Sequence, residues 1–420
     1  MKPRSPVFVV GGAHTAFLGR GRPEFIDRKH PDYGERTNPG LEEHMAEAVQ
    51  RCLEVTKVDP REIDRGVVSN FLGELFCSQG HLGSMLARVE PALEGRPLER
   101  VEAACASGAA SIARAIDGLQ CSDDVTLVVG VEIETNVPGT QGVEYMAAAA
   151  HYREESKLDF ALFPWMFARR AKAYKERFGC THEDLARVPV KAYTNANLNP
   201  LALNHEVSIT YEEASTVGRH NREFLEDEEL REHIRVLDCT ALTDGASAVI
   251  LATEEGLWRM GLPIEDCTEI LGYGHSTRAL GRSTDFSQMR NMRDAAWRAY
   301  ADAGIGPKDV QLAEVHDCFA VAELQCMEAL GLAERGRAWQ KLADGDTQIS
   351  GRIPVNPGGG LIGFGHPVGA TGVKQVVEVW RQMTNKCGAY QVPGEPRYAV
   401  TANLGGDDRT SIVMLHGRTD

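Results

Sequence analysis

The 420-residue sequence has no hydrophobic run long enough to cross a membrane or to act as a signal segment. The apolar run near its start, Val7 to Val10, is far too short for either role and fits a buried strand. Residues 417–420 read Gly-Arg-Thr-Asp, which is neither a peroxisomal nor an endoplasmic-reticulum address. We therefore expect a compact cytoplasmic protein that does not enter a membrane.

The sequence also lacks any Cys-x-x-Cys pair. Its ten cysteines occur singly along the chain, at positions 52, 77, 105, 121, 180, 239, 267, 318, 326 and 387. This scatter argues against a disulfide framework and against a zinc knuckle. Most of these side chains are expected to be small buried hydrophobes.

Positive charge is scarce, since 45 Lys and Arg face 60 Asp and Glu and the net charge is −15. Nucleic acid and anionic membranes both require clustered positive charge, so neither is expected as a partner. A polyanionic ligand would need a local basic patch. The segment 169–177 is the densest candidate, with Arg169, Arg170 and Lys172 at its start, and the alternative is that it forms a solvated helix face.

The alternation of short Val/Ile/Leu-rich runs with longer helical stretches predicts an α/β protein whose sheets are covered on both faces. Expected strands include residues 65–70, 124–130, 246–251 and 410–415, and expected helices include 41–57 and 289–303. A hydrophobic content of 43% and a charged content of 25% are ordinary for a globular protein. At this length two packed units are expected.

A weak internal repeat indicates how these units are arranged. Residues 60–68 match 307–315 at the same spacing, residues 244–251 match 408–415, and Cys-Ala-Ser-Gly-Ala at 105–109 opens a helix much as Gly-Ala-Thr-Gly-Val does at 369–373. Chance similarity between αβ units is the alternative. We predict two similar halves, residues 1–254 and 255–420, with an inserted loop subdomain at about 131–243 that holds helices over 164–178 and 182–195.

The first reactive side chain is Cys105, which lies among small residues in Ala-Cys-Ala-Ser-Gly. A strand end over residues 100–104 precedes it and a helix follows, so the sulfur is expected at a helix N-terminus. Free N–H groups and the helix dipole would lower the pKa of the thiol there and favour the thiolate. Taken alone, this segment also fits a buried packing cysteine.

His366 lies in a second segment, the glycine-dense stretch 356–367 that precedes a helix expected over 370–383. Its imidazole could take a thiol proton and later return it to a reacting oxygen. The alternative is a phosphate-cradling loop, but the stretch lacks the lysine and the spacing of a P-loop.

His316 and Cys318 form the third segment, His-Asp-Cys-Phe, which follows a strand expected over 312–315. Because side chains alternate across a strand, His316 and Cys318 can face one cavity while Asp317 points elsewhere and holds a loop. A His-x-Cys pair could also be half of a metal site. No second pair has matching spacing, so no metal is expected.

Together these three segments resemble the active site of a thiolase, and the resemblance extends over nearly the whole chain. The pattern is most similar to the sterol-carrier-protein-2-type and archaeal-type thiolases. The best-known thiolases have Asn-Glu-Ala-Phe where this chain has His-Asp-Cys-Phe, and a C-terminal Cys-x-Gly where it has Asn403-Leu404-Gly405. In the sterol-carrier-type branch the cysteine of His-Asp-Cys-Phe is expected to replace that missing cysteine, and Cys318 matches it.

The resemblance implies a layered α/β/α/β/α fold and a ping-pong acyl-CoA C-acyltransferase, acetyl-CoA acetyltransferase-like. His366 would activate Cys105 to accept an acyl group from a coenzyme A thioester, and Cys318 would remove an α-proton from a second acyl-CoA. The enolate oxygen would be bound by His316 and His366, and the tetrahedral intermediate by the backbone N–H groups of Cys105 and Gly405. The reverse reaction would cleave a 3-oxoacyl-CoA.

The resemblance further implies coenzyme A thioesters as substrates, no tightly bound cofactor, and a homodimer or homotetramer. The residues Arg169, Arg170 and Lys172 would then contact coenzyme A. Three alternatives remain open at this point: a decarboxylating ketosynthase-like enzyme, an acyltransferase or aldolase that needs a small OB-fold partner protein, and a non-catalytic acyl-CoA-binding scaffold.

Overall fold

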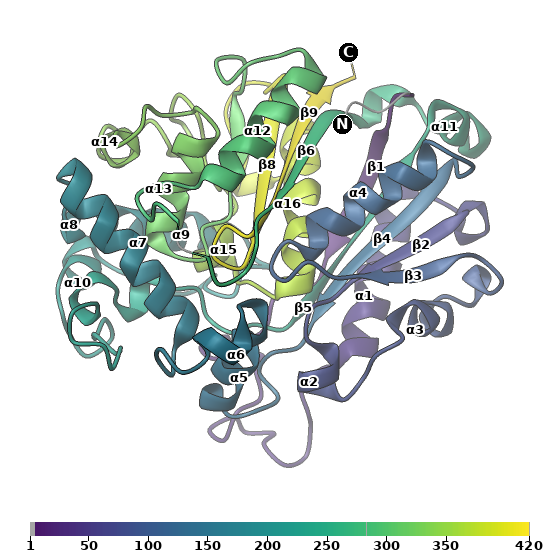
Figure 1. Ribbon diagram of the computed structural model, residues 1–420. Helices are drawn as coiled ribbons and strands as arrows, with labels where there is room; N and C mark the ends of the chain where they lie inside the picture. The colour runs from purple at the N-terminus through teal and green to yellow at the C-terminus, as the bar shows by residue number, and fades with distance from the viewer. Residues whose placement is uncertain (1–4, 283, 420) are drawn as a thin grey trace.

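The computed structural model describes residues 5–282 and 284–419 (Figure 1). Its strands form one hydrogen-bonded sheet in the order β3-β2-β4-β5-β1-β6-β9-β8-β7. The strands are β1 Phe8–His14, β2 Arg65–Ser69, β3 Leu98–Val101, β4 Val125–Glu132, β5 Gly245–Ala252, β6 Thr268–Thr277, β7 Leu312–Glu314, β8 Tyr398–Gly405 and β9 Thr410–Arg418.

The helices lie on both faces of this sheet and in a separate group at one side (Figure 1). They are α1 Leu41–Thr56, α2 Gly73–Cys77, α3 Leu82–Val89, α4 Ser107–Leu119, α5 Gly139–Met146, α6 Tyr152–Glu155, α7 Leu162–Phe178, α8 His182–Leu185, α9 Arg187–Ala196, α10 Tyr211–Ser215, α11 Glu254–Met260, α12 Arg290–Ala303, α13 Ala320–Ala329, α14 Ala338–Ala343, α15 Gly360–Phe364 and α16 Val368–Met383.

The two halves of the sheet repeat one topology. In the first half β2 and β4 are parallel, while β5 and β1 continue antiparallel. In the second half β7 and β8 are parallel, and β9 and β6 continue antiparallel in the same order. A short pairing of Phe8 and Val9 with Glu269 and Thr268 joins β1 to β6. The segments that match in sequence thus lead into, or form, equivalent strands.

The layers follow from which helices cover which strands. Helices α4 and α16 lie between the two halves of the sheet, α1 and α3 cover the outside of the first half, and α12 covers the outside of the second. This is the expected α/β/α/β/α arrangement, and the apolar side chains of the middle layer come from both halves.

Helices α4 and α16 cross at two glycines, Gly108 and Gly372. A methyl group on Gly108 would lie 2.6 Å from the backbone nitrogen of Gly372, and one on Gly372 would lie 2.4 Å from that of Ala109. No side chain fits at such distances, so glycine is required for the two helices to approach. These glycines occupy the same position in the two matching segments, 105–109 and 369–373.

The excursion between β4 and β5 carries α5 to α10 and packs against α13, α14 and α15 of the second half (Figure 1). The single helix expected over 182–195 is two, α8 and α9. Pro189 explains the break, because its nitrogen cannot donate to the carbonyl of Leu185 four residues earlier. The expected loop at 356–367 contains the one-turn helix α15.

Over residues 5–282 and 284–419, no helix combines the length and the apolar character that crossing a bilayer requires.

Candidate active site

Cys105 lies in a tight turn between β3 and α4. The amide of Ala106 donates to the carbonyl of Ala103 at 3.1 Å, and the amide of Ser107 donates to that of Ala104 at 3.0 Å. The hydroxyl of Ser107 accepts from the amide of Ala103 at 2.9 Å, which closes the turn. Ala104 has a φ of +50°, a conformation that non-glycine residues rarely adopt. The turn fixes Cys105 at the start of the helix, as the sequence indicates.

The environment of Cys105 favours the neutral thiol and not the thiolate expected from the sequence. Burial raises the pKa of the Cys105 thiol to about 12, the backbone N–H of Gly406 lowers it, and the nearby carboxyls of Glu134 and Glu132 raise it further. Desolvation of the charged form therefore outweighs the donors at the start of α4. The environment of Cys105 therefore favours its neutral thiol.

His366 follows α15 and precedes α16, and its hydrogen bonds indicate which ring nitrogen carries the hydrogen. Its Nδ1 lies 2.6 Å from the hydroxyl oxygen of Thr371, and that hydroxyl donates to the carbonyl of Pro367 at 3.0 Å. Because the Thr371 hydroxyl uses its own hydrogen for the carbonyl of Pro367, the hydrogen between Thr371 and His366 must be on Nδ1. The other ring nitrogen, Nε2, therefore carries a lone pair. Burial lowers the pKa of His366 to about 3, which keeps the ring neutral.

His316 and Cys318 follow β7, which ends at Glu314, one residue earlier than expected. Asp317 points away from both, as the alternation suggests. Its carboxylate accepts from the amides of Leu361 at 2.7 Å and Ile362 at 3.5 Å at the start of α15. Asp317 thus ties the His316–Cys318 loop to the helix that leads into His366.

The structure brings all four predicted side chains together. The sulfur of Cys105 and one ring nitrogen each of His316 and His366 lie within 4.8 Å of one another. The two imidazole centroids are 4.9 Å apart in an edge arrangement. Cys318 is close enough to Cys105 for the two thiols to interact electrostatically, and burial together with Cys105 raises its pKa.

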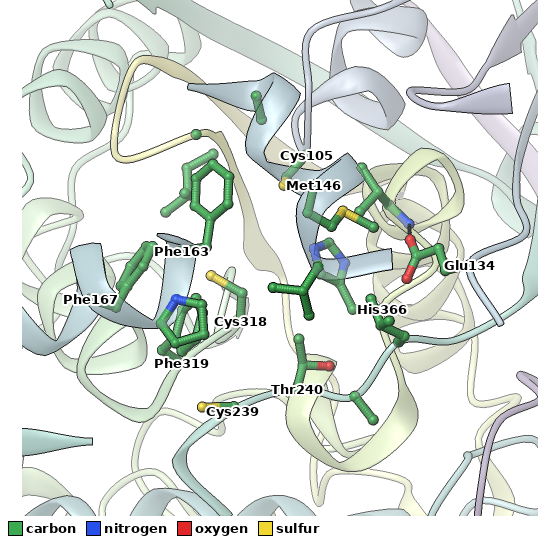
Figure 2. Close-up of a pocket in the computed structure, with 18 residues that line it drawn as sticks. Cys105, Glu134, Met146, Phe163, Phe167, Cys239, Thr240, Cys318, Phe319 and His366 are labelled. Carbon is green, nitrogen blue, oxygen red and sulfur yellow. Dashed lines mark hydrogen bonds between the residues drawn. The ribbon is translucent and has the colours of Figure 1, made fainter. Parts of the chain in front are cut away.

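A cavity of about 150 Å³ opens onto three of these groups, whereas the fully buried His316 is not part of its wall. Cys105, Cys318 and His366 face it together, and Glu134 lies beyond His366 (Figure 2). Most of the remaining wall is apolar and comes from the inserted segment and from the loops around the site: Val143, Met146, Ala149, Phe163, Pro164, Phe167, Cys239, Thr240, Ala241, Leu242, Phe319, Val368 and Leu404. Such a lining suits an apolar acyl group next to a thiol.

Gly406 is the glycine that lines the cavity, next to the predicted Gly405. Its N–H is hydrogen-bonded to the Cys105 sulfur, and its φ is +65°. The adjacent glycines at 405 and 406 indicate in the sequence that the backbone can approach a ligand here, but the sequence alone does not say which of the two amides faces the Cys105 sulfur.

Glu132 and Glu134, at the end of β4, were missed by the sequence analysis. The carboxylate of Glu132 accepts from the amides of Phe71, Leu72 and Gly369 at 2.8 to 3.0 Å. That of Glu134 accepts from the amide of Val368 at 2.9 Å. Burial raises the pKa of Glu132 to about 7. The two acids hold the start of α16, and the visible signal was a pair of acids at the end of an apolar strand.

The basic segment in α7 divides between two faces of the helix, and one part of the prediction is wrong. Arg170 is fully buried, forms an ion pair with Asp407 and donates to the carbonyl of Gln288, so it cannot contact coenzyme A. Arg169 stacks between Trp165 and Phe286, and Lys172 pairs with Glu176 at the surface. A contact between coenzyme A and Arg169 or Lys172 stays a prediction.

The family assignment comes from comparison with known sequences. The family model described as "Thiolase, N-terminal domain" matches residues 33–255, and the one described as "Thiolase C-terminal domain-like" matches 272–418. The acetyl-CoA acetyltransferase of Methanothermobacter thermautotrophicus is 32% identical over 375 residues, covering 89% of this chain and 94% of its own. This chain therefore belongs to the thiolase superfamily and is a thiolase-type acyl-CoA C-acyltransferase.

Solved structures support the same fold. The Ltp2-ChsH2(DUF35) aldolase superposes with a TM-score of 0.78 at 22% identity, covering 100% of this chain and 99% of the other. Human mitochondrial 3-ketoacyl-CoA thiolase superposes with a TM-score of 0.69 at 17% identity, covering 99% of both chains. The layered thiolase fold expected from the sequence is confirmed.

Proposed function

We propose that this chain is an acetyl-CoA C-acetyltransferase-like thiolase that works through an acyl group on Cys105. The observation that carries the proposal is that two thiols and one imidazole line one small apolar cavity, with a second imidazole packed against the first. A decarboxylating ketosynthase needs only one thiol and two imidazoles and leaves Cys318 without a role. A scaffold would need none of the four.

The first half-reaction transfers an acyl group. His366 Nε2 takes the proton of Cys105 as the sulfur attacks the thioester carbon, and the oxyanion is bound by the N–H groups of Cys105 and Gly406. The bond between the acyl carbon and the coenzyme A sulfur then breaks. The departing thiolate takes the proton of Cys318, which leaves a Cys318 thiolate beside a protonated His366.

The second half-reaction forms the carbon–carbon bond. The Cys318 thiolate removes an α-proton from a second acyl-CoA, and His316 and protonated His366 bind the enolate oxygen. The enolate carbon attacks the acyl carbon, the bond to the Cys105 sulfur breaks, and that sulfur recovers its proton from His366. Every proton is returned, and one coenzyme A thiol is released for each bond formed.

Electrostatics supports this order of steps. The pKa of Cys318 is raised first by burial and next by the neighbouring Cys105. Acylation of Cys105 removes its ionisable thiol, so Cys105 no longer raises the pKa of Cys318 at the step in which the Cys318 thiolate is needed. Two thiolates never have to coexist in the cavity.

A second, arginine-rich pocket is a candidate for the phosphates of coenzyme A. It has a volume of about 240 Å³, and its lining has four arginines, Arg278, Arg282, Arg290 and Arg409, against two carboxylates, Asp285 and Asp408. Arg409 lies three residues after Gly406, which lines the active-site cavity, and its guanidinium donates to the carbonyls of Ala279 and Arg282 on the other side of the pocket. Guanidinium groups suit phosphate geometry, and a local cluster is what a chain of net charge −15 requires.

This assignment is tested with Arg282→Glu. Its KM for acetyl-CoA should rise about tenfold or more, the loss of one charge-assisted contact, whereas its KM for acetyl-pantetheine, which lacks the nucleotide, should stay unchanged. Arg96→Glu, an exposed arginine at the opposite end of β3 from Cys105, is the matched control. A parallel rise for both substrates would show that this pocket does not bind the phosphates.

Coenzyme A thioesters are substrates rather than resident cofactors, and no metal takes part. The chain acts in the cytoplasm as a homodimer or homotetramer, and its boundary between thiolase halves lies at about residue 255. A small OB-fold partner protein is the second candidate for its assembly, because the solved aldolase that superposes on it contains a DUF35 partner.

The experiment that tests the function is a substrate panel. Purified protein is mixed with acetyl-, acetoacetyl- and longer 3-oxoacyl-CoA thioesters, and free coenzyme A is followed in both directions. Radioactive acetyl-CoA should also leave label on Cys105 in the intact protein. Absence of label together with absence of coenzyme A release would refute the acyltransferase proposal.

A further inference from the structure

We propose that Asn403 is a positioning residue that holds the ring hydrogen of His316 on Nε2, and that Gln375 holds Asn403 in the orientation this requires. The inference rests on the proposed role of His316 at the enolate oxygen. An imidazole can fill that role as a neutral ring only if the nitrogen facing the substrate carries a hydrogen.

The inference follows from a chain of buried hydrogen bonds. Gln375 Nε2 donates to the carbonyl of Ala402 at 3.4 Å, which turns Gln375 Oε1 toward Asn403. Asn403 Nδ2 donates to that oxygen at 3.0 Å, and the same nitrogen lies 3.0 Å from His316 Nδ1. An amide nitrogen only donates, so His316 Nδ1 accepts and the ring hydrogen must be on Nε2.

The opposite orientation of the Asn403 amide is unfavourable. It would place Asn403 Oδ1 against Gln375 Oε1, so that two acceptors would face each other unless Gln375 turned and lost the carbonyl of Ala402. Asn403, Gln375 and His316 are each at most 1% exposed, so water cannot replace a lost partner.

Residues of helix α16 fix the position of the ring hydrogen in both imidazoles: on Nδ1 in His366 and, through Asn403, on Nε2 in His316. Thr371, which accepts from His366 Nδ1, and Gln375 are four residues apart and therefore lie on the same face of the helix. His366 thus presents a lone pair at Nε2 and His316 presents an N–H. Within the described residues neither Nε2 has a hydrogen-bond partner; His366 lines the cavity and His316 packs directly against it.

The same arrangement bears on metal binding. Cys105 and the two histidines offer one sulfur and two ring nitrogens within 4.8 Å of one another, a donor set that suits Zn²⁺. A ring nitrogen that carries a hydrogen cannot ligate a cation. By keeping the hydrogen of His316 on Nε2, Asn403 therefore removes one ligand from the set.

The direct test is nitrogen NMR of the free protein with ¹⁵N-labelled histidine. The resonances of His316 and His366 are assigned by their absence in His316→Gln and His366→Gln. We expect the hydrogen on Nε2 in His316 and on Nδ1 in His366. A hydrogen on Nδ1 of His316 would overturn the inference, and this measurement needs no activity at all.

Two variants test the consequence. Asn403→Leu keeps the size but has no N–H, so condensation and α-proton exchange should fall at least about tenfold while acylation of Cys105 is retained. In Asn403→Asp a carboxylate accepts from His316 Nδ1, which leaves Nε2 free to ligate. Zn²⁺, titrated against a chromophoric chelator, should then bind about 10 to 100 times more tightly than to the wild type.

The control is Thr401→Val, two residues earlier in β8, which removes a buried contact of 3.2 Å to His416. It should change none of these readouts. Equal losses of acylation and condensation in Asn403→Leu, or unchanged Zn²⁺ affinity in Asn403→Asp, would refute the positioning role. A wild type that never acylates Cys105 would instead refute the proposed function.

Discussion

Replacing Cys318 by alanine should separate the two half-reactions. Cys318 lines the cavity beside Cys105, but the proposed attack on the thioester uses only Cys105, His366 and backbone donors. Its thiol has two roles in the scheme, as proton donor to the departing coenzyme A and as base for the α-proton. Only the second has no substitute, because coenzyme A is a good leaving group and can take its proton from His366 or from water.

The expected magnitude follows from the loss of a general base, which typically contributes about 10²- to 10⁴-fold. Cys318→Ala should therefore lower the condensation rate by at least about 10²-fold, while the acylation burst stays within about threefold of the wild type. Deleting one buried sulfur should lower the free energy of unfolding by about 1 kcal/mol, too little to unfold the protein.

Two assays measure these steps separately. Rapid-quench mixing with acetyl-CoA measures the burst of free coenzyme A and the acyl label on Cys105. Incubation in D₂O followed by mass spectrometry measures α-proton exchange of the second substrate. The matched control is Cys326→Ala, because Cys326 is buried behind the site against Met289 and does not line the cavity. Loss of both burst and condensation in Cys318→Ala alone would show that Cys318 is structural.

Three further outcomes are expected. Gly108→Ala should lower the free energy of unfolding by about 1–3 kcal/mol in urea titrations, because the helices α4 and α16 cannot separate, whereas Gly139→Ala in open space should be neutral. Because burial raises the pKa of Cys105 to about 12, its thiolate fraction and its rate of alkylation by iodoacetamide should rise about tenfold per pH unit up to pH ~10. A plateau below pH ~9 would contradict that pKa. Arg170→Ala should cost about 3–5 kcal/mol of stability, since it leaves Asp407 buried and unpaired, and should leave KM unchanged. A KM effect without loss of stability would return Arg170 to the coenzyme A site.

Local patterns were sufficient for the main features of the fold and for the four reactive side chains. The expected strands and most helices lie within a few residues of those observed, because apolar periodicity reflects burial directly. Cys105, His316, Cys318 and His366 could be found because each occupies a short segment of unusual composition. The structure, rather than the sequence, shows that they meet.

Features that depend on long-range packing escaped the sequence. The inward face of α7 could not be known before its neighbours were placed, so Arg170 was assigned to a surface that it does not reach. The pKa of Cys105 depends on how much protein encloses it, and a helix start alone gave the wrong sign. Gln375 and Asn403 are remote in sequence from His316, so nothing local connects them to it.

The close approach of α4 and α16 has a consequence for the origin of the enzyme. One copy of the repeated unit supplies the sulfur of Cys105, the proposed nucleophile, ahead of its helix, and the other supplies the imidazole of His366, the proposed base, ahead of the equivalent helix. The proposed nucleophile, Cys105, and its proposed base, His366, therefore come from different halves of the chain. If the halves arose by duplication, the same position ahead of the helix became a thiol in one copy and part of an imidazole-bearing loop in the other.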